Sequence, residues 1–306
     1  MTSSAQNPSQ PLAPLALFAQ HERSFATNRF VYPVLSRRSG GLSIGVNLNP
    51  DKVCNFDCIY CQVDRTRQSE TRFLETPAML AELDAMLRLA VSGEIFLTEK
   101  FLGTPPALRR LNDIAFSGDG EPTTYRNFDE IIAGCAELKR RHGLDDVKMV
   151  LITNASMFHR EHVRRGLEIL DANQGEIWAK LESGTEAYYK LVERTPIPFR
   201  QILDNITAAA RVRPLVIQAL FMRINGQPPP ADEQAAFCDR LNEIGAAGGQ
   251  IKLVQIYTVA RPPAESFVAP LSDAEVDALA DLVRRRTGLP AAAFYGHLDS
   301  LATADN

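Results

Sequence analysis

Three cysteines lie within eight residues of this chain, at Cys54, Cys58 and Cys61, with the spacing Cys-x3-Cys-x2-Cys. Three thiolates on one short loop can hold three irons of a cubane iron–sulfur cluster and leave the fourth iron open. Electron-carrying ferredoxins close all four irons with cysteines, and structural zinc takes four protein ligands. The triplet therefore indicates a cluster that binds a further molecule and does chemistry on it.

Structural zinc is the main alternative for the same three cysteines. It needs a fourth ligand, and the two remaining cysteines, Cys135 and Cys238, each stand alone in the sequence. His142 is not at metal-ligand spacing to the triplet. The ligand count therefore favours a cluster over zinc.

A second feature follows about sixty residues later, in the segment Ser117–Thr123. Gly118 and Gly120 allow the backbone to come close to a ligand, because they have no Cβ. Asp119 and Glu121 supply carboxylates just after a short apolar run that reads as a strand. Such a segment alone is an ordinary turn signal, but after a cysteine triplet it indicates a cofactor site.

These two segments resemble the signature of the radical S-adenosylmethionine (SAM) superfamily. The likeness rests on the cysteine spacing, on Tyr60 before the last cysteine and on Asn55-Phe56 after the first. It implies a [4Fe-4S] cluster whose open iron is chelated by the amino and carboxylate groups of SAM. One electron from the reduced cluster then cleaves SAM into methionine and a 5′-deoxyadenosyl radical, which abstracts hydrogen from a substrate.

The resemblance also implies roles for individual residues. Cys54, Cys58 and Cys61 would be the iron ligands, Tyr60 would pack near the adenine of SAM, and the segment containing Gly118, Asp119, Gly120 and Glu121 would receive the SAM amino group. Glu182 and Ser183 have the position that contacts the ribose hydroxyls or the SAM carboxylate. Asn154 ends a predicted strand and can bind the same groups, or can instead cap the next helix.

Within the superfamily, the chain resembles most closely the proteins related to tRNA wyosine-base synthases. Wyosine-base synthases carry further cysteines upstream for a second cluster, whereas this chain has none before Cys54. The resemblance therefore implies the general radical chemistry rather than their pyruvate-dependent reaction. It rests on four segments: Tyr32–Arg38, Gly45–Pro50, Lys180–Thr185 and Tyr257–Pro263.

Apolar runs alternate with amphipathic stretches along the chain. Short, β-branched runs predict buried parallel strands at 43–48, 113–117, 147–153, 176–182, 215–222 and 251–258. Helical periodicity predicts helices at about 78–91, 128–141, 159–171, 200–212, 231–246 and 272–287. This order predicts an α/β fold with a parallel sheet, an open partial (β/α)6 barrel of the TIM type. Such barrels place function at the carboxyl ends of the strands, where the motifs fall.

Lys180 is the candidate catalytic residue. It alternates with Glu182 along a predicted strand, so both side chains should face the interior of the barrel. A buried lysine beside a carboxylate is costly unless the two are paired. Lys180 is thus either half of a salt bridge or a Schiff-base or acid–base group.

The composition and net charge of the chain limit the kinds of partner it can bind. The 306 residues are 45% hydrophobic and carry a net charge of −4, so a global basic surface for nucleic acid is missing and no DNA partner is expected. Arginines nevertheless bracket the cysteine loop, and they either hold an acidic or phosphorylated group or belong to a solvated loop. These arginines are Arg37, Arg38, Arg65, Arg67 and Arg72.

Location and domain boundaries follow from local signals. Five cysteines, three of them together, do not make a disulfide framework, and a thiolate cluster indicates a reducing, cytoplasmic location. The apolar residues 12–19 are too short to span a membrane and lack the basic residue of an export signal. We expect an arm at 1–25, a radical SAM partial barrel at 26–290 and a tail at 291–306.

Three functions remain open at this point. The first is radical chemistry on an RNA base or nucleotide, as the nearest resemblance implies. The second is the same chemistry on a peptide, a protein glycyl site or a small metabolite. The third is a metal-binding or electron-transfer protein without catalysis. For the first two, the superfamily implies a reductant partner such as flavodoxin or ferredoxin.

Overall fold

The computed structural model describes residues 25–36, 38–65, 69, 71–263 and 265–296. Eight strands form one curved sheet in the order β1-β2-β3-β4-β5-β6-β8-β10. β1 pairs with β2 antiparallel, and the other neighbours are parallel. Their bounds are β1 Val31–Ser36, β2 Gly41–Val46, β3 Leu111–Phe116, β4 Lys148–Thr153, β5 Gly175–Lys180, β6 Leu215–Leu220, β8 Ile251–Tyr257 and β10 Ala291–Phe294.

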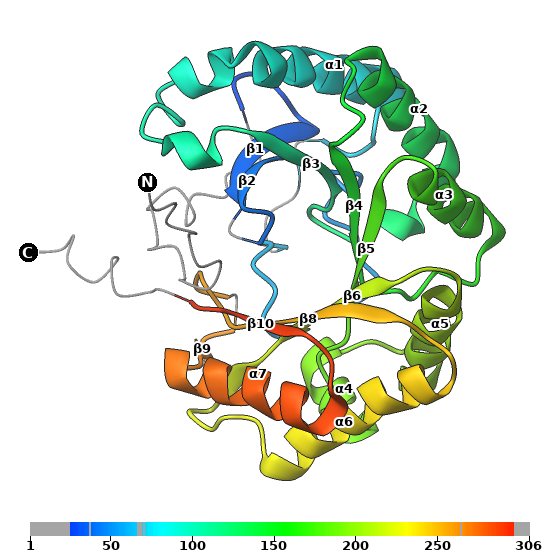
Figure 1. The fold of residues 1–306 in the computed structure, drawn as a ribbon, viewed down its shortest axis with the longest axis vertical. Helices are drawn as coiled ribbons and strands as arrows, with labels where there is room; N and C mark the ends of the chain where they lie inside the picture. Colours follow the sequence, from blue (N-terminus) through cyan, green and yellow to red (C-terminus); the bar gives the residue numbers. More distant parts are fainter. Residues whose placement is uncertain (1–24, 37, 66–68, 70, 264, 297–306) are drawn as a thin grey trace, which may run out of the picture.

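Helices cover the convex side of this sheet and leave its concave side open (Figure 1). They are α1 Thr76–Ser92, α2 Phe128–Arg141, α3 Glu161–Asp171, α4 Glu186–Glu193, α5 Phe199–Val212, α6 Ala231–Ala246 and α7 Asp273–Thr287. Short 3-10 turns lie at Glu94–Leu97, Pro106–Leu108 and Pro122–Thr124. None of the helices in the described part of the chain is long and apolar enough to cross a membrane.

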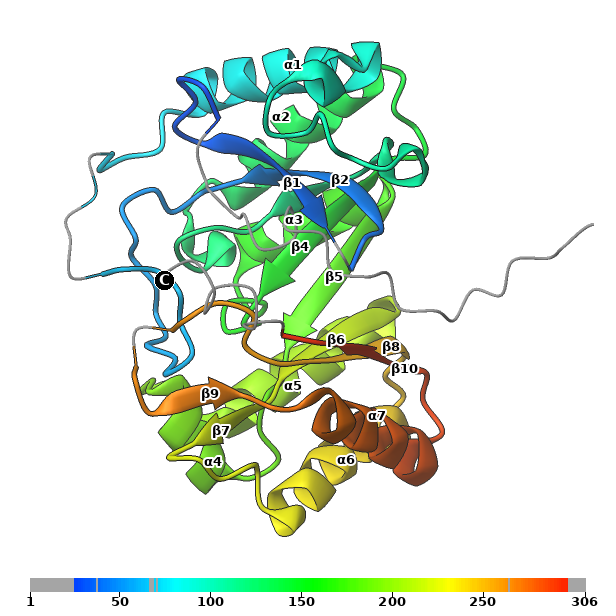
Figure 2. The ribbon, with the colours of Figure 1, turned by 90° about the vertical axis from the view of Figure 1, so that its left-hand side faces the viewer.

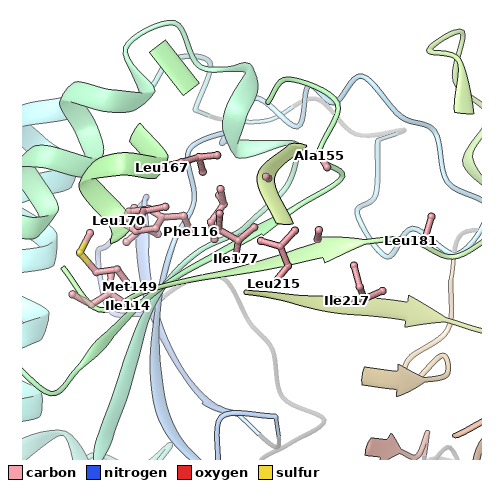
Figure 3. Packing of buried hydrophobic residues seen from close by; sticks show 14 of the residues in the cluster. Ile114, Phe116, Met149, Ala155, Leu167, Leu170, Ile177, Leu181, Leu215 and Ile217 are labelled. Carbon is pink, nitrogen blue, oxygen red and sulfur yellow. The ribbon is translucent and has the colours of Figure 1, made fainter. Parts of the chain in front are cut away.

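The main core lies between the sheet and its helices. Figure 3 shows Ile114, Phe116 and Ile177 of the strands beside Leu167 and Leu170 of α3, and all five belong to one buried cluster. Because side chains alternate along a strand, the residues between them point the other way, into the concave side. A separate small cluster of Ala115, Val150, Trp178 and Val216 covers part of that inner face.

The predicted partial barrel is confirmed, since the six predicted strands correspond to β2, β3, β4, β5, β6 and β8. Five helices and strands were not predicted: the edge strand β1, the eight-residue helix α4, the edge strand β10, and the strands β7 (Met222–Ile224) and β9 (Val268–Pro270), which form a separate antiparallel pair. The strand predicted to reach Met222 ends at Leu220, and Met222 begins β7 instead.

The predicted terminal segments are only partly described. The expected N-terminal arm lies almost wholly outside the described residues, and so do residues 297–306. Ala291–Phe294, which the sequence assigns to the tail, pair with β8 as strand β10. The sheet therefore extends into the segment expected to be a tail.

The carboxyl ends of the parallel strands gather at one edge of the sheet. The segment 47–65, which carries the cysteines, follows β2 along this edge (Figure 2). The turns after β3, β4 and β5 lie at the same edge, because these strands run parallel in register. The fold therefore brings together the segments in which the sequence predicts the site.

Candidate active site

A cavity of about 310 Å³ occupies the concave side of the sheet and reaches the ends of its strands. Glu182 and Ser183 are buried but do not line it. The other predicted site residues do line it: Cys54, Cys58, Tyr60, Cys61, Gly118, Asp119, Gly120, Glu121, Asn154 and Lys180. The fold thus gathers the cysteine loop, the Gly118–Glu121 segment and Lys180 around one space.

The cysteine loop is anchored on the end of α4. The backbone N–H of Asp57 donates to the carbonyl of Glu193 at 3.1 Å, and that of Ile59 donates to the carbonyl of Val192 at 2.9 Å. The last carbonyls of a helix have no partner within the helix, so they are available as acceptors. The unpredicted helix α4 therefore fixes the loop that carries Cys58.

Asn154 holds the same loop from the end of β4. Its Nδ2 donates to Asn55 Oδ1 at 2.9 Å, and Asn55 Nδ2 donates to Ser156 Oγ at 2.7 Å. The N–H of Ser156 closes the ring of contacts by donating to Asn154 Oδ1 at 3.1 Å. The Asn154 amide is thus engaged with the protein, and its predicted contact with SAM stays a prediction.

Glu121 is a buried carboxylate with a full set of donors. It accepts hydrogen bonds from the Thr123 N–H at 3.1 Å, the Thr123 hydroxyl at 2.5 Å, the Thr153 hydroxyl at 2.6 Å and the Asn154 N–H at 2.7 Å. Burial raises the pKa of Glu121, and these donors oppose the rise. Two carboxylate oxygens accept about four hydrogen bonds. Glu121 therefore joins the ends of β3 and β4 and has little capacity left for a ligand.

The two glycines of the segment allow two loops to touch. A Cβ on Gly118 would overlap the side chain of Asn47, and one on Gly120 would overlap the carbonyl oxygen of Val53. Asn47 also accepts from the Asp119 N–H at 3.1 Å and donates to the Asp119 carboxylate at 2.6 Å. The sequence predicted that these glycines let the backbone approach a ligand. In the structure, they let it approach the segment that carries the cysteines.

Tyr60, Lys180 and Glu182 form a buried polar network. The Tyr60 hydroxyl donates to Glu182, and Lys180 Nζ lies 3.4 Å from the Tyr60 oxygen and 5.2 Å from its ring centroid. Tyr257 donates to the other Glu182 oxygen at 3.5 Å. Burial lowers the pKa of Lys180, but the acidic groups around it, Glu182 foremost, outweigh burial and raise it. The environment therefore keeps Lys180 protonated, which opposes a Schiff-base role that needs a neutral amine.

The three thiols are in unlike surroundings. Cys58 Sγ donates to Glu193 Oε2 at 2.9 Å, and Arg65 Nη2 lies 3.7 Å from Cys61 Sγ. Burial raises the pKa of Cys58, and the charge of Glu193 adds to the rise. Burial also raises the pKa of Cys54, where Arg65 acts in the opposite direction.

The chemistry of this donor set fits an iron–sulfur cluster, although the side chains are not gathered around a metal. Over the described residues, no group of three or more histidine, cysteine, aspartate or glutamate side chains is placed to hold a metal ion. All three thiols are free and line one cavity, with the Arg65 cation beside two of them. Because an iron ligand is a thiolate, Cys58 would no longer donate to Glu193 when bound to iron.

The turn after β5 is held from behind by α6. Glu233 accepts from the Thr185 hydroxyl at 2.6 Å and from the Gly184 N–H. Next to them, the buried Ser183 Oγ has no hydrogen-bond partner in the described structure. An unpaired buried hydroxyl is costly, but Ser183 does not line the cavity, and its predicted contact with SAM stays a prediction.

Two supporting glutamates escaped prediction from the sequence. Glu193 contacts Cys58 although 135 positions separate them, and Glu233 contacts Thr185 across 48 positions. Neither glutamate lies in a motif, so only the folded chain reveals them. Asn55 lies within the predicted cysteine loop, and the sequence pointed to it only through its position directly after Cys54.

Comparison with known proteins identifies a family and related sequences. A family model described as the radical SAM superfamily matches residues 48–233. A UPF0026 protein of Helicobacter pylori strain J99 is 28% identical over 250 residues, which cover 80% of this chain and 70% of that protein. A GTPase Obg of Brachyspira hyodysenteriae is 27% identical over 191 residues, 61% of this chain but 24% of that protein. This chain therefore spans about a quarter of the length of that relative.

The fold is shared with a solved structure as well. The crystal structure of Streptococcus suis SuiB bound to S-adenosylmethionine has a TM-score of 0.56 at 15% identity, covering 88% of this chain and 54% of that one. At such identity the likeness concerns the fold alone. The family model, in contrast, covers more than half of this sequence. The chain belongs to the radical SAM superfamily, and its cofactors are accordingly a [4Fe-4S] cluster and SAM.

Proposed function

We propose that this chain is an enzyme in which Cys54, Cys58 and Cys61 hold three irons of the cluster and leave the fourth for SAM. With both cofactors bound, reductive cleavage of SAM supplies a 5′-deoxyadenosyl radical that takes a hydrogen atom from a substrate in the cavity. The observation that carries the proposal is the single cavity shared by the three thiols, the Gly118–Glu121 segment and the strand ends.

The residues of the chain have distinct tasks in this proposal. Arg65 lies beside Cys61 and opposes the rise that burial causes in the pKa of Cys54. Asp119, oriented by Asn47, is the carboxylate of its segment offered to the SAM amino group, because Glu121 already accepts four hydrogen bonds from the protein. Lys180 remains a cation at the wall of the cavity and attracts anionic groups there.

The proposed substrate is an RNA base or a nucleotide. The support is the resemblance of four segments to proteins related to wyosine-base synthases, together with the cations Arg38 and Lys180 in the cavity lining. The proposed electron source is a low-potential carrier such as flavodoxin or ferredoxin, as is usual in the superfamily.

The test is anaerobic reconstitution with iron and sulfide, followed by dithionite and SAM. The wild-type protein should form 5′-deoxyadenosine and methionine, and Cys58→Ala should form neither. Cys238→Ala is the matched control, because this buried cysteine lies on α6 away from the cavity. It should retain both the cluster and the product.

One outcome would overturn the proposal. A wild-type protein with a full complement of iron and sulfide that forms no 5′-deoxyadenosine, either alone or with cell extract as a source of substrate, does not perform this chemistry.

A further inference from the structure

Part of the cavity is not used by the proposed cofactor site. Its lining includes residues of the inner face of β5, β6 and β8. Lys180 pairs with Gln218 across β5 and β6, and Gln218 pairs with Gln255 across β6 and β8. Trp178 and Tyr257 lie two residues from this row on their strands, so they share its face. This row makes a wall with both polar and aromatic groups.

Arg38 reaches across this wall from the segment after β1. Its guanidinium carbon lies 5.6 Å from the Trp178 ring centroid and 5.2 Å from that of Tyr257. Within the described residues, Arg38 forms these two ring contacts and no ion pair. A guanidinium stacked on ring faces keeps its N–H donors in its own plane, where they can bind a carboxylate or phosphate in a bidentate manner.

Gln218 lies on β6, between the strands that carry the two rings. Its side chain is 0% exposed, and its Nε2 donates to Gln255 Oε1 at 2.9 Å. Its Oε1 is buried without a hydrogen-bond partner, although Gln218 lines the cavity. A buried acceptor without a partner is costly, so this oxygen is suited to accept from an N–H or O–H of a ligand.

We propose that Arg38, Trp178, Tyr257 and Gln218 form the substrate subsite, and that they bind a small molecule carrying an oxyanion beside an N–H or O–H donor. Arg38 binds the oxyanion, the two rings hold its guanidinium in place, and Gln218 accepts from the donor. The oxyanion is a phosphate or a carboxylate, which the same guanidinium recognises. This inference rests on the proposed function, because it names the chemical class of its substrate.

Trp178 allows a direct test, because it is the only tryptophan of the chain. Its fluorescence should be followed in the reconstituted protein with saturating SAM, during titration with two matched pairs of probes. Guanosine 5′-monophosphate and guanosine differ by a phosphate, so comparing their affinities measures the contribution of that group. Orotate and uracil differ by a carboxylate and serve in the same way. We expect saturable binding of at least one anionic probe and about tenfold weaker binding of its neutral partner.

Variants assign this binding to the subsite. Arg38→Gln should weaken binding of the anionic probe by about tenfold or more. Arg38→Lys should weaken this binding less, because lysine keeps the positive charge but lacks the planar guanidinium that binds an oxyanion through two N–H groups. Arg29→Gln is the matched control, since Arg29 lies 4.8 Å from the Phe30 ring centroid but outside the cavity lining. It should bind like the wild type.

Two results would overturn the subsite: no response of Trp178 fluorescence to either anion, or equal affinity in Arg38→Gln and wild type. Formation of 5′-deoxyadenosine from SAM and dithionite without substrate is measured on the same wild-type protein, and it should be unchanged in the control Arg29→Gln. If the wild type forms none but binds anions through Arg38, the proposed function fails and the subsite stands. If it forms the product but binds no anion, the reverse holds.

Discussion

The two ends of the barrel interior arrange their charged groups differently. The floor, where the strands begin, holds the buried Asp113, the partly buried Glu176 and the half-exposed Lys148 and Lys252. Glu176 accepts from both lysines and from Trp178 Nε1 at 2.8 Å, and Asp113 accepts from Ser43. The mouth, where the strands end, holds Tyr60, Lys180, Glu182 and Glu193.

The acidic groups of the mouth accept hydrogen bonds from neutral groups but form no ion pair within the described residues. Glu182 and Glu193 are buried close together with a thiol, and among the described residues no ion pair joins Lys180 to either of them. Buried charges without direct partners are destabilising. Proteins tolerate such local conflict mainly at functional sites. The floor is therefore arranged for stability, and the mouth for ligands that complete it.

The largest effect is expected where the mouth is assembled. Gly120→Ala would place a Cβ against the Val53 carbonyl oxygen and 2.7 Å from Asn49 Cβ, so the Gly118–Glu121 segment and the cysteine loop must separate. We expect iron bound after anaerobic reconstitution to fall at least about fivefold, since overpacking of this kind costs roughly 1–3 kcal/mol. Iron and sulfide per protein are the measurement.

Gly103→Ala is the matched control for this substitution. A Cβ at Gly103 would meet nothing within 4 Å. This variant should bind as much iron as the wild type. Equal iron content in Gly120→Ala would show that the contact between the two loops is not needed for the cluster.

A smaller effect, on stability, is expected at the floor. Glu176→Gln turns a paired carboxylate into an amide facing two lysines, and should lower the free energy of unfolding at pH 7 by about 2 kcal/mol. Burial raises the pKa of Glu176, but hydrogen bonds from Lys252, Trp178 and Lys148 outweigh burial and lower it below its ordinary 4.5. The variant, with no carboxylate to titrate, should therefore differ most from wild type above pH 4.5.

The sign of the pH dependence is the sharper test. A carboxyl group with a lowered pKa in the folded state stabilises the fold above its unfolded pKa and loses this effect as the pH falls through the folded pKa. Urea unfolding should show the gap between wild type and Glu176→Gln narrowing on acidification below pH 4.5. A constant gap from pH 7 to pH 4 would mean that the ion pairs do not carry the effect. The exposed Glu99→Gln should show little gap at any pH.

Local sequence patterns predicted the strands and the type of chemistry. The residues that hold the site in place could not be predicted, because they contact it from positions far away in the sequence. Cys54, Cys58 and Cys61 are recognisable because their spacing alone defines the loop. Glu193 is not, since only the packing of α4 brings it to Cys58. β1 was missed because Pro33 lowers its strand signal, and a proline is acceptable there only because β1 is an edge strand.

The smallest effect on the free energy of unfolding is expected when one of the two floor lysines is replaced. Lys148 Nζ lies 3.0 Å from Glu176 Oε2 and its side chain is half exposed, while Lys252 contacts the same oxygen. Lys148→Met should therefore cost only about 0.2–1 kcal/mol in urea unfolding, because Lys252 still pairs with the carboxylate. Lys148→Met/Lys252→Met should cost more than the sum of the single variants, because Glu176 then keeps its charge without a cation. Strict additivity would mean that each lysine acts on Glu176 independently, and the floor would then not be the mutually dependent charge cluster that distinguishes it from the mouth.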